Sequence, residues 1–156
     1  MTELSFRFAC ASEREALENL QRRASLVYDV YRPALLANPG AIHLPPAQLE
    51  EQCVRVVEES GAVLGFSVVL PRGEVCELDG LFVEPGNWRR GIGRALMEDA
   101  FNLGRAGGAW IMEVKTNPQA EGFYVRLGFT RTGLVTTPFG IASKMRRSLG
   151  QTGHQT

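Results

Sequence analysis

One segment of the sequence has the residue types of an anion-binding site. It reads Arg89, Arg90, Gly91, Ile92, Gly93 and Arg94, and a helix is expected from about Ile92 to Gly104. The first N–H groups of a helix have no intrahelical partner and lie at the positive end of its dipole. Gly91 and Gly93 let an anion approach the backbone, and the arginines add positive charge. The segment therefore predicts a phosphate site at a helix start.

Two familiar glycine motifs do not fit this segment. A P-loop needs Lys and then Ser or Thr after its second glycine, whereas Ile92 and Gly93 follow Gly91. A dinucleotide fingerprint starts directly after a strand and ends in Gly or Ala. Here Gly91 lies eight residues beyond Val83, and the last position of the motif is Leu96. An arginine-rich helix start without a ligand is the remaining alternative for the segment taken alone.

A pair of carboxylates lies in the strand expected just before this segment. Glu77 and Asp79 are two residues apart in the stretch 75–83, so their side chains point to the same face of a strand. Carboxylates placed in this way can serve as a general base. The alternative is that one or both are structural and bind neighbouring loops.

The composition of the chain excludes several classes of protein. Its 156 residues are 44% hydrophobic and 22% charged, which is typical of one soluble globular domain. The net charge is zero, so general affinity for nucleic acid is not expected. The three cysteines form no CxxC, and the two histidines lie far apart, so no metal site is predicted. No signal or membrane-spanning segment is found, and we expect a cytoplasmic protein without membrane contact.

Hydrophobic periodicity predicts an α/β (α+β) fold. Strands are expected at 4–8, 54–57, 63–70, 75–83, 109–114, 129–135 and 139–145, and helices at about 12–36, from 46, at 92–104 and at 117–127. A capping box is expected at Ser12–Glu15, and a break near Pro33. The helix between 75–83 and 109–114 makes these two strands parallel. We expect one domain over residues 1–149 and a flexible tail at 150–156.

Two motifs in this order resemble the GCN5-related N-acetyltransferase (GNAT) superfamily. One is Leu81-Phe82-Val83-x-Pro85 followed by Arg90-Gly91-Ile92-Gly93-Arg94-Ala95-Leu96; the other is Asn117-x-x-Ala120-x-x-Phe123-Tyr124-x-x-x-Gly128-Phe129. The resemblance covers residues 54–145 well and 4–53 loosely. The family pattern has Gln or Arg where this chain has Trp88, which we interpret as a loop aromatic that packs on the domain.

The resemblance implies a mixed, mostly antiparallel sheet flanked by helices, in which the parallel strands 75–83 and 109–114 splay apart. Pantetheine is then expected between them, paired with the main chain of Leu81, Phe82 and Val83 and contacted by Asn117. Residues 89–94 would hold the pyrophosphate. The implied cofactor is acetyl-CoA or another short acyl derivative of coenzyme A.

The implied activity is transfer of the acyl group to a primary amine of a small molecule or peptide. Glu77 matches the family's glutamate base, with Asp79 as the second candidate, and Tyr124 matches the tyrosine that protonates the departing thiolate. A non-catalytic CoA-binding regulatory module of the same fold is the alternative. The resemblance also allows a homodimer through an edge strand within 129–145, and no residue identifies the acceptor.

Overall fold

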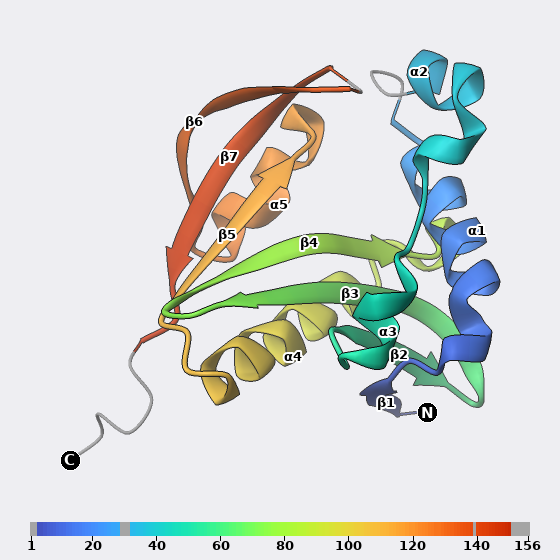
Figure 1. The fold of residues 1–156 in the computed structure, drawn as a ribbon, viewed down its shortest axis with the longest axis horizontal. Helices are drawn as coiled ribbons and strands as arrows, with labels where there is room; N and C mark the ends of the chain where they lie inside the picture. The colour runs from blue at the N-terminus through green and yellow to red at the C-terminus, as the bar shows by residue number, and fades with distance from the viewer. Residues whose placement is uncertain (1–2, 29–31, 139, 151–156) are drawn as a thin grey trace. The chain divides into compact units, whose positions relative to one another are not determined.

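The computed structural model describes residues 3–28, 32–138 and 140–150. Within these residues seven strands form one sheet, with hydrogen-bonded neighbours in the order β1-β2-β3-β4-β5-β7-β6. The strands are β1 (Leu4–Phe8), β2 (Val54–Glu59), β3 (Ala62–Arg72), β4 (Val75–Val83), β5 (Ile111–Thr116), β6 (Thr130–Thr137) and β7 (Gly140–Ser148). The helices are α1 (Arg14–Ser25), α2 (Arg32–Ala37), α3 (Pro46–Glu50), α4 (Ile92–Ala106) and α5 (Glu121–Arg126) (Figure 1).

The predicted fold class is confirmed. The strand pairs β1–β2, β2–β3, β5–β7 and β6–β7 are antiparallel. Strands β4 and β5 are parallel, as a helical connection requires. Their register runs from Val75↔Ile111 to Leu78↔Val114, and no later pair joins them in the described residues, although both strands continue.

The chain divides into two compact units, which are described separately. Unit 1 comprises residues 1–68 and 80–99, and unit 2 comprises residues 69–79 and 100–156. The expectation of a single domain over residues 1–149 therefore stays a prediction. The expected tail lies outside the described residues from position 151 onward.

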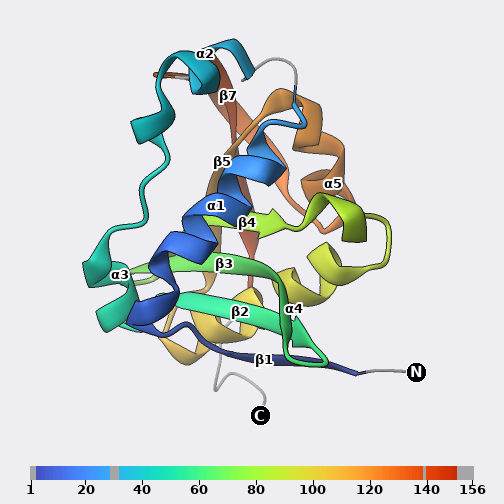
Figure 2. The same cartoon turned by 90° about the vertical axis from the view of Figure 1, so that its right-hand side faces the viewer.

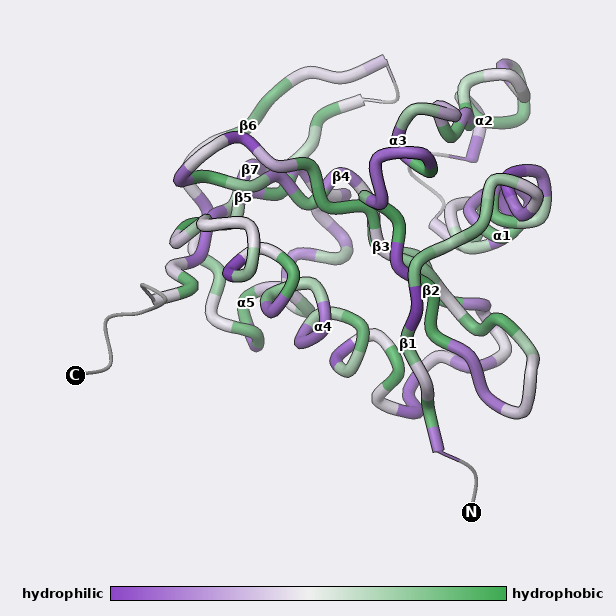
Figure 3. The backbone as a smooth tube through the Cα atoms, turned by 60° about the horizontal axis from the view of Figure 1, so that its bottom comes forward, coloured by the Kyte–Doolittle hydropathy of each residue, from purple (hydrophilic) through white to green (hydrophobic). Residues whose placement is uncertain are grey.

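The core of unit 1 lies between its sheet and the first part of α4. Val57, Leu64, Ile92 and Leu96 are buried together there, and Leu4, Phe6, Leu81 and Val83 pack against them. Helix α1 covers the other face of the sheet of unit 1 (Figure 2). Polar and apolar residues alternate along α1 and α4 (Figure 3), as expected for helices with one face on a sheet.

The first helical region differs from the prediction in two respects. The capping interaction forms at Cys10, whose N–H donates to Glu13 at 2.8 Å, and not at Ser12. Arg7 on β1 binds the same carboxylate at 2.8 and 2.9 Å. This contact holds the Glu13 side chain beside the Cys10 N–H group. In addition, α2 begins at Arg32. Pro33 therefore lies in the first turn of a new helix, where its missing N–H costs nothing.

In unit 2 one face of the sheet is apolar and covered by helices. Cys76 pairs with Met112, and Val114 with Met145, across this face. The end of α4 approaches it so closely that a Cβ on Gly104 would lie 2.9 Å from the Cys76 Sγ atom. Helix α5 lies beside β5 and β7 (Figures 1 and 2). Because side chains alternate along a strand, the neighbouring positions of β4, β5 and β7 face the other side.

That opposite face of unit 2 is charged. It is formed by Glu77 on β4, Glu113 and Lys115 on β5, and Lys144 and Arg146 on β7. No helix among the described residues is long and apolar enough to span a membrane.

Candidate active site

The loop before α4, in unit 1, has two residues in the left-handed backbone conformation. Arg89 and Gly91 have φ angles of 69° and 79°, in the left-handed region that favours glycine. The Gly91 carbonyl accepts the Ala95 N–H at 3.0 Å, so the helix starts directly behind it. A Cβ placed on Gly91 would meet no atom within 4 Å. The space before the first helical N–H groups is therefore open to a ligand.

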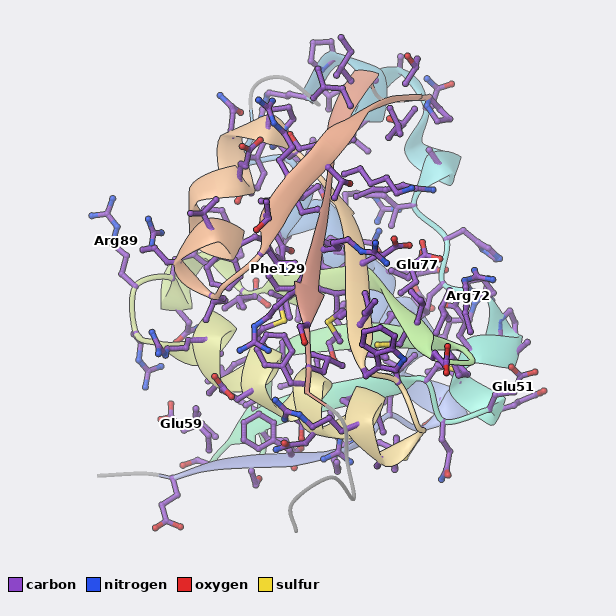
Figure 4. All side chains as sticks on the ribbon, turned by 90° about the vertical axis from the view of Figure 1, so that its left-hand side faces the viewer. Glu51, Glu59, Arg72, Glu77, Arg89 and Phe129 are labelled. Atoms are coloured by element: carbon purple, nitrogen blue, oxygen red, sulfur yellow. The ribbon has the colours of Figure 1, made fainter. Side chains whose placement is uncertain are left out.

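The three arginines of this loop are not equivalent. The Arg90 guanidinium binds both carboxylate oxygens of Glu59 at 3.1 and 2.9 Å and also donates to Asn87. These contacts attach the loop to the end of β2. Arg89 and Arg94 are exposed, and the Arg89 side chain extends outward from the loop (Figure 4). Arg90 thus holds the loop in shape, while Arg89 and Arg94 are placed to meet a ligand from solution.

Trp88 is a loop aromatic that packs within unit 1, as its sequence position was interpreted. Its indole N–H donates to the Val83 carbonyl at 2.8 Å, which ties the loop to the end of β4. Its ring centroid lies 5.8 Å from that of Tyr28, and burial raises the pKa of the Tyr28 hydroxyl. One lone pair of the Val83 carbonyl is therefore already used within unit 1.

Glu77, in unit 2, lies in a small pocket on the charged face of the sheet. The pocket has a volume of about 150 Å³ and is lined by Arg72, Val75, Glu77, Glu113, Val114, Lys115 and Lys144. The Glu77 Oε1 atom is 3.0 Å from both Nε and a terminal nitrogen of Arg72 (Figure 4). Asp79 is exposed and does not line the pocket.

The pairing between β4 and β5 ends just after Glu77. The last paired residues of β4 and β5 are Leu78 and Val114. Glu77 therefore stands one residue before the point where the two parallel strands stop pairing. Where two neighbouring strands no longer pair, their backbone N–H and C=O groups can form hydrogen bonds with the amide groups of a ligand.

Tyr124 lies on α5, which belongs to the helix-covered side of unit 2. Its side chain is buried and makes edge-to-face contacts with Phe123 and Phe129, with ring centroids 5.1 and 5.4 Å apart. Its carbonyl accepts the N–H groups of Leu127 and Phe129 at 3.0 Å. The ring is thus fixed by packing on both sides, and the helix end is fixed by backbone bonds.

Asn117, directly after β5, has an unsatisfied buried donor. The residue is 6% exposed, and its Oδ1 atom accepts the Gln119 N–H at 2.9 Å. Its Nδ2 group has no hydrogen-bond partner in the described part of the chain. A buried donor without a partner is costly, so this amide is suited to a ligand carbonyl.

The buried cysteines are poor nucleophiles. Burial raises the pKa of the Cys76 thiol to about 11 and also raises the pKa of Cys53. Since the thiolate is the reactive form, neither residue is suited to carry an acyl group at neutral pH. Among the described residues, no three His, Cys, Asp or Glu side chains are grouped to hold a metal ion.

Comparison with known families identifies the family of the chain. The family model described as an acetyltransferase (GNAT) domain matches residues 50–131, more than half of the chain. The chain belongs to the GNAT acetyltransferases. It is an acyl-CoA-dependent N-acetyltransferase, and the predicted family and cofactor are confirmed.

Solved structures share the GNAT fold over almost the whole chain. Ard1 from Thermoplasma volcanium has a TM-score of 0.74 at 19% identity and covers 95% of this chain and 99% of its own. The PaiA N-acetyltransferase from Thermoplasma acidophilum, in complex with coenzyme A, has a TM-score of 0.74 at 14% identity, with coverages of 94% and 99%. The ribosomal-protein-S18-alanine N-acetyltransferase from Escherichia coli has a TM-score of 0.71 at 16% identity, with coverages of 99% and 98%. These TM-scores establish a shared fold, and the low identities leave the acceptor open.

We expect Gly91→Val to raise the dissociation constant of this GNAT chain for coenzyme A about tenfold or more, as measured by calorimetry. A valine would fill the open space before the helix start and resist the left-handed backbone. The matched control is Gly61→Val in the β2–β3 turn, where φ is 83° and the surroundings are also open. It introduces the same strain, so it lowers stability but leaves the affinity unchanged. Equal losses of affinity in the two variants would show that the phosphate site lies elsewhere.

Proposed function

We propose that the chain transfers an acetyl group from acetyl-CoA directly to a primary amine of a small molecule or peptide, with Glu77 as the base and Tyr124 as the acid. The observation that supports this most directly lies within unit 2. Glu77 is on the open face of the sheet, Tyr124 is on the helix that covers the other face, and β4 and β5 stop pairing beside Glu77. A thioester that enters between the strands can be reached from both faces.

In this proposal, coenzyme A is bound by backbone groups and by side-chain hydrogen-bond donors. The main chain of Leu81, Phe82 and Val83 pairs with the amides of pantetheine. The helix start formed by Arg89, Arg90, Gly91, Ile92, Gly93 and Arg94 holds the pyrophosphate. The unpaired Asn117 Nδ2 group donates to a pantetheine carbonyl. The open space at Gly91 and the buried unsatisfied amide both support this assignment.

The chemistry requires a neutral amine and a protonated leaving group. Acetyl-CoA supplies the acetyl group as an activated thioester. A lysine-type amine has a pKa of about 10.4, so roughly one molecule in a thousand is neutral at pH 7. Glu77 removes the proton from the amine, directly or through water, with Asp79 as the second candidate. Tyr124 donates its hydroxyl proton to the departing sulfur, and the raised pKa of Cys76 argues against an acyl-cysteine route.

Two measurements on the full chain test the proposal. Acetyl-CoA at about 100 times its dissociation constant adds roughly 2.7 kcal/mol to the free energy of unfolding, which a thermal-shift assay detects. NAD and ATP serve as controls and have no comparable effect. Transfer to a panel of amines, followed as release of free thiol, then separates the enzyme from the alternative. Stabilisation by acetyl-CoA without transfer to any amine would favour a non-catalytic CoA-binding module, and the absence of both effects would refute both functions.

A further inference from the structure

The two lysines of the chain are neighbours in the Glu77 pocket. The sequence contains 15 arginines but only Lys115 and Lys144 as lysines. These two residues, 29 positions apart, are direct cross-strand partners on β5 and β7. Both line the pocket that also contains Glu77. Directly opposed side chains have Cβ atoms about 4.5–5.5 Å apart, and like charges in such a pair repel each other.

The acidic residues of the pocket are already neutralised by arginines. Arg72 binds Glu77 at 3.0 Å, and Arg146 lies 3.6 Å from Glu113. No ion pair to the ammonium group of Lys115 or Lys144 occurs within the part of the chain that the structure describes. The pocket therefore carries two adjacent positive charges that its own carboxylates do not compensate.

From this arrangement we infer that the acceptor carries an anionic group beside its amine, and that Lys115 and Lys144 bind that group. The inference rests on the proposed transfer to an amine and adds the chemical class of the acceptor. A lysine ammonium is a compact positive charge with three hydrogen-bond donors. Two neighbouring ammonium groups can both donate to the oxygens of one carboxylate or phosphate. An anion between them converts the repulsion of the pair into two attractions.

The spacing of the strands agrees with a small bifunctional acceptor. Lys115 is two residues beyond Glu113, which is the direct partner of Glu77. Two residues of a strand span roughly 6.7 Å. An amine held at Glu77 and an anion held at the lysines are thus separated by a few bonds in one molecule. The pocket volume of about 150 Å³ suits a compound of this size.

The first test compares amines that carry an anionic group with related amines that lack one. Acceptors are β-alanine, 4-aminobutyrate and 2-aminoethyl phosphate, each paired with a neutral analogue: β-alaninamide, 4-aminobutyramide and ethanolamine. We expect wild-type kcat/KM to favour the anionic member of at least one pair by about tenfold or more. Carboxylate and phosphate acceptors separate the two sources of the anion. Equal kcat/KM values within every pair would overturn the inference and leave the transfer function standing.

Substitution of the lysines assigns the effect to them. In Lys115→Gln and Lys144→Gln we expect KM for the anionic acceptor to rise about tenfold, with the kinetics of the neutral analogue unchanged. Lys144→Arg restores most of the loss because it returns the charge. Arg131→Gln is the matched control, since it removes one positive charge from β6, outside the pocket. If Arg131→Gln reproduced the loss, the effect would come from net charge and the inference would fail.

A binding test that needs no turnover keeps the inference separate from the proposed function. An amine-reactive ester labels the side chains of the two lysines, Lys115 and Lys144. The labelling rate of the terminal amine serves as the reference for both. We expect N-acetyl-β-alanine to slow labelling of both lysines, and N-acetyl-β-alaninamide to have no effect, as read by peptide mass spectrometry. Protection without any transfer would support the anion site and refute the transfer function. Equal labelling with both probes, or acetylation of either lysine by acetyl-CoA alone, would overturn the inference.

Discussion

Replacing Glu77 by Gln is expected to lower kcat about 10²–10⁴-fold at neutral pH, with little change in the dissociation constant for acetyl-CoA. Glutamine keeps the size of the side chain but cannot accept a proton from the amine. The loss shrinks as the pH rises toward the pKa of the acceptor amine, because the amine then reaches the site already neutral. A pH profile of kcat for both proteins measures this dependence.

Three controls separate proton transfer from a structural role of Glu77. Arg72→Gln removes the partner of Glu77 in the 3.0 Å ion pair but leaves the carboxylate. If Glu77 served only to hold Arg72, the two variants would lose activity equally. Glu113→Gln changes a carboxylate of the same pocket and is expected to cost at most a few-fold. Asp79→Asn tests the second candidate; a loss there as large as predicted for Glu77, with Glu77→Gln active, would move the base to Asp79.

Replacing Tyr124 by Phe is expected to lower kcat about 10²–10⁴-fold while the affinity for acetyl-CoA stays nearly the same. The ring contacts with Phe123 and Phe129 do not involve the hydroxyl, so packing survives. The hydroxyl acts on the sulfur, which becomes negative only as its bond breaks. An interaction made only in the transition state changes turnover and not ground-state binding.

The acidity of the leaving thiol provides the discriminating measurement for Tyr124. Acetyl thioesters of more acidic thiols need less protonation, so the ratio of wild-type to variant kcat should fall along such a series. Calorimetric titration with acetyl-CoA and thermal unfolding verify that binding and folding are intact. Full turnover of Tyr124→Phe, under conditions where chemistry limits the rate, would reduce Tyr124 to a packing residue.

Much of the secondary structure and strand arrangement of this protein could be predicted from short stretches of sequence. The glycines and arginines before residue 92 predicted where α4 starts, because the requirements of a helix start are local. Alternating apolar residues predicted β4 over Val75–Val83 with its observed bounds. The helix between the strands predicted that β4 and β5 are parallel. The spacing of Glu77 and Asp79 made both candidates for the base, and the family resemblance supplied the preference for Glu77 and the role of Tyr124. These assignments stay predictions.

Two features of the first helical region differ from what its local pattern predicted. The shift of the capping interaction to Cys10 follows from Arg7, which holds Glu13 from a neighbouring strand. The break before α2 differs from the expected one because Pro33 begins a helix and does not end one. The pattern from Ser12 onward could not predict the cap at Cys10, because Arg7 lies outside that segment.

Short stretches of the sequence predicted the family, the order of the elements and the glycine-rich helix start, because residues within a few positions of one another encode them. The folded chain showed that Arg72 pairs with Glu77, that Trp88 binds the Val83 carbonyl, and that the Asn117 Nδ2 group has no partner among the described residues. It also brought Lys115 opposite Lys144. Strand register explains the lysine pair: a shift of one residue turns every side chain to the other face of the sheet, and packing of the sheet fixes that register.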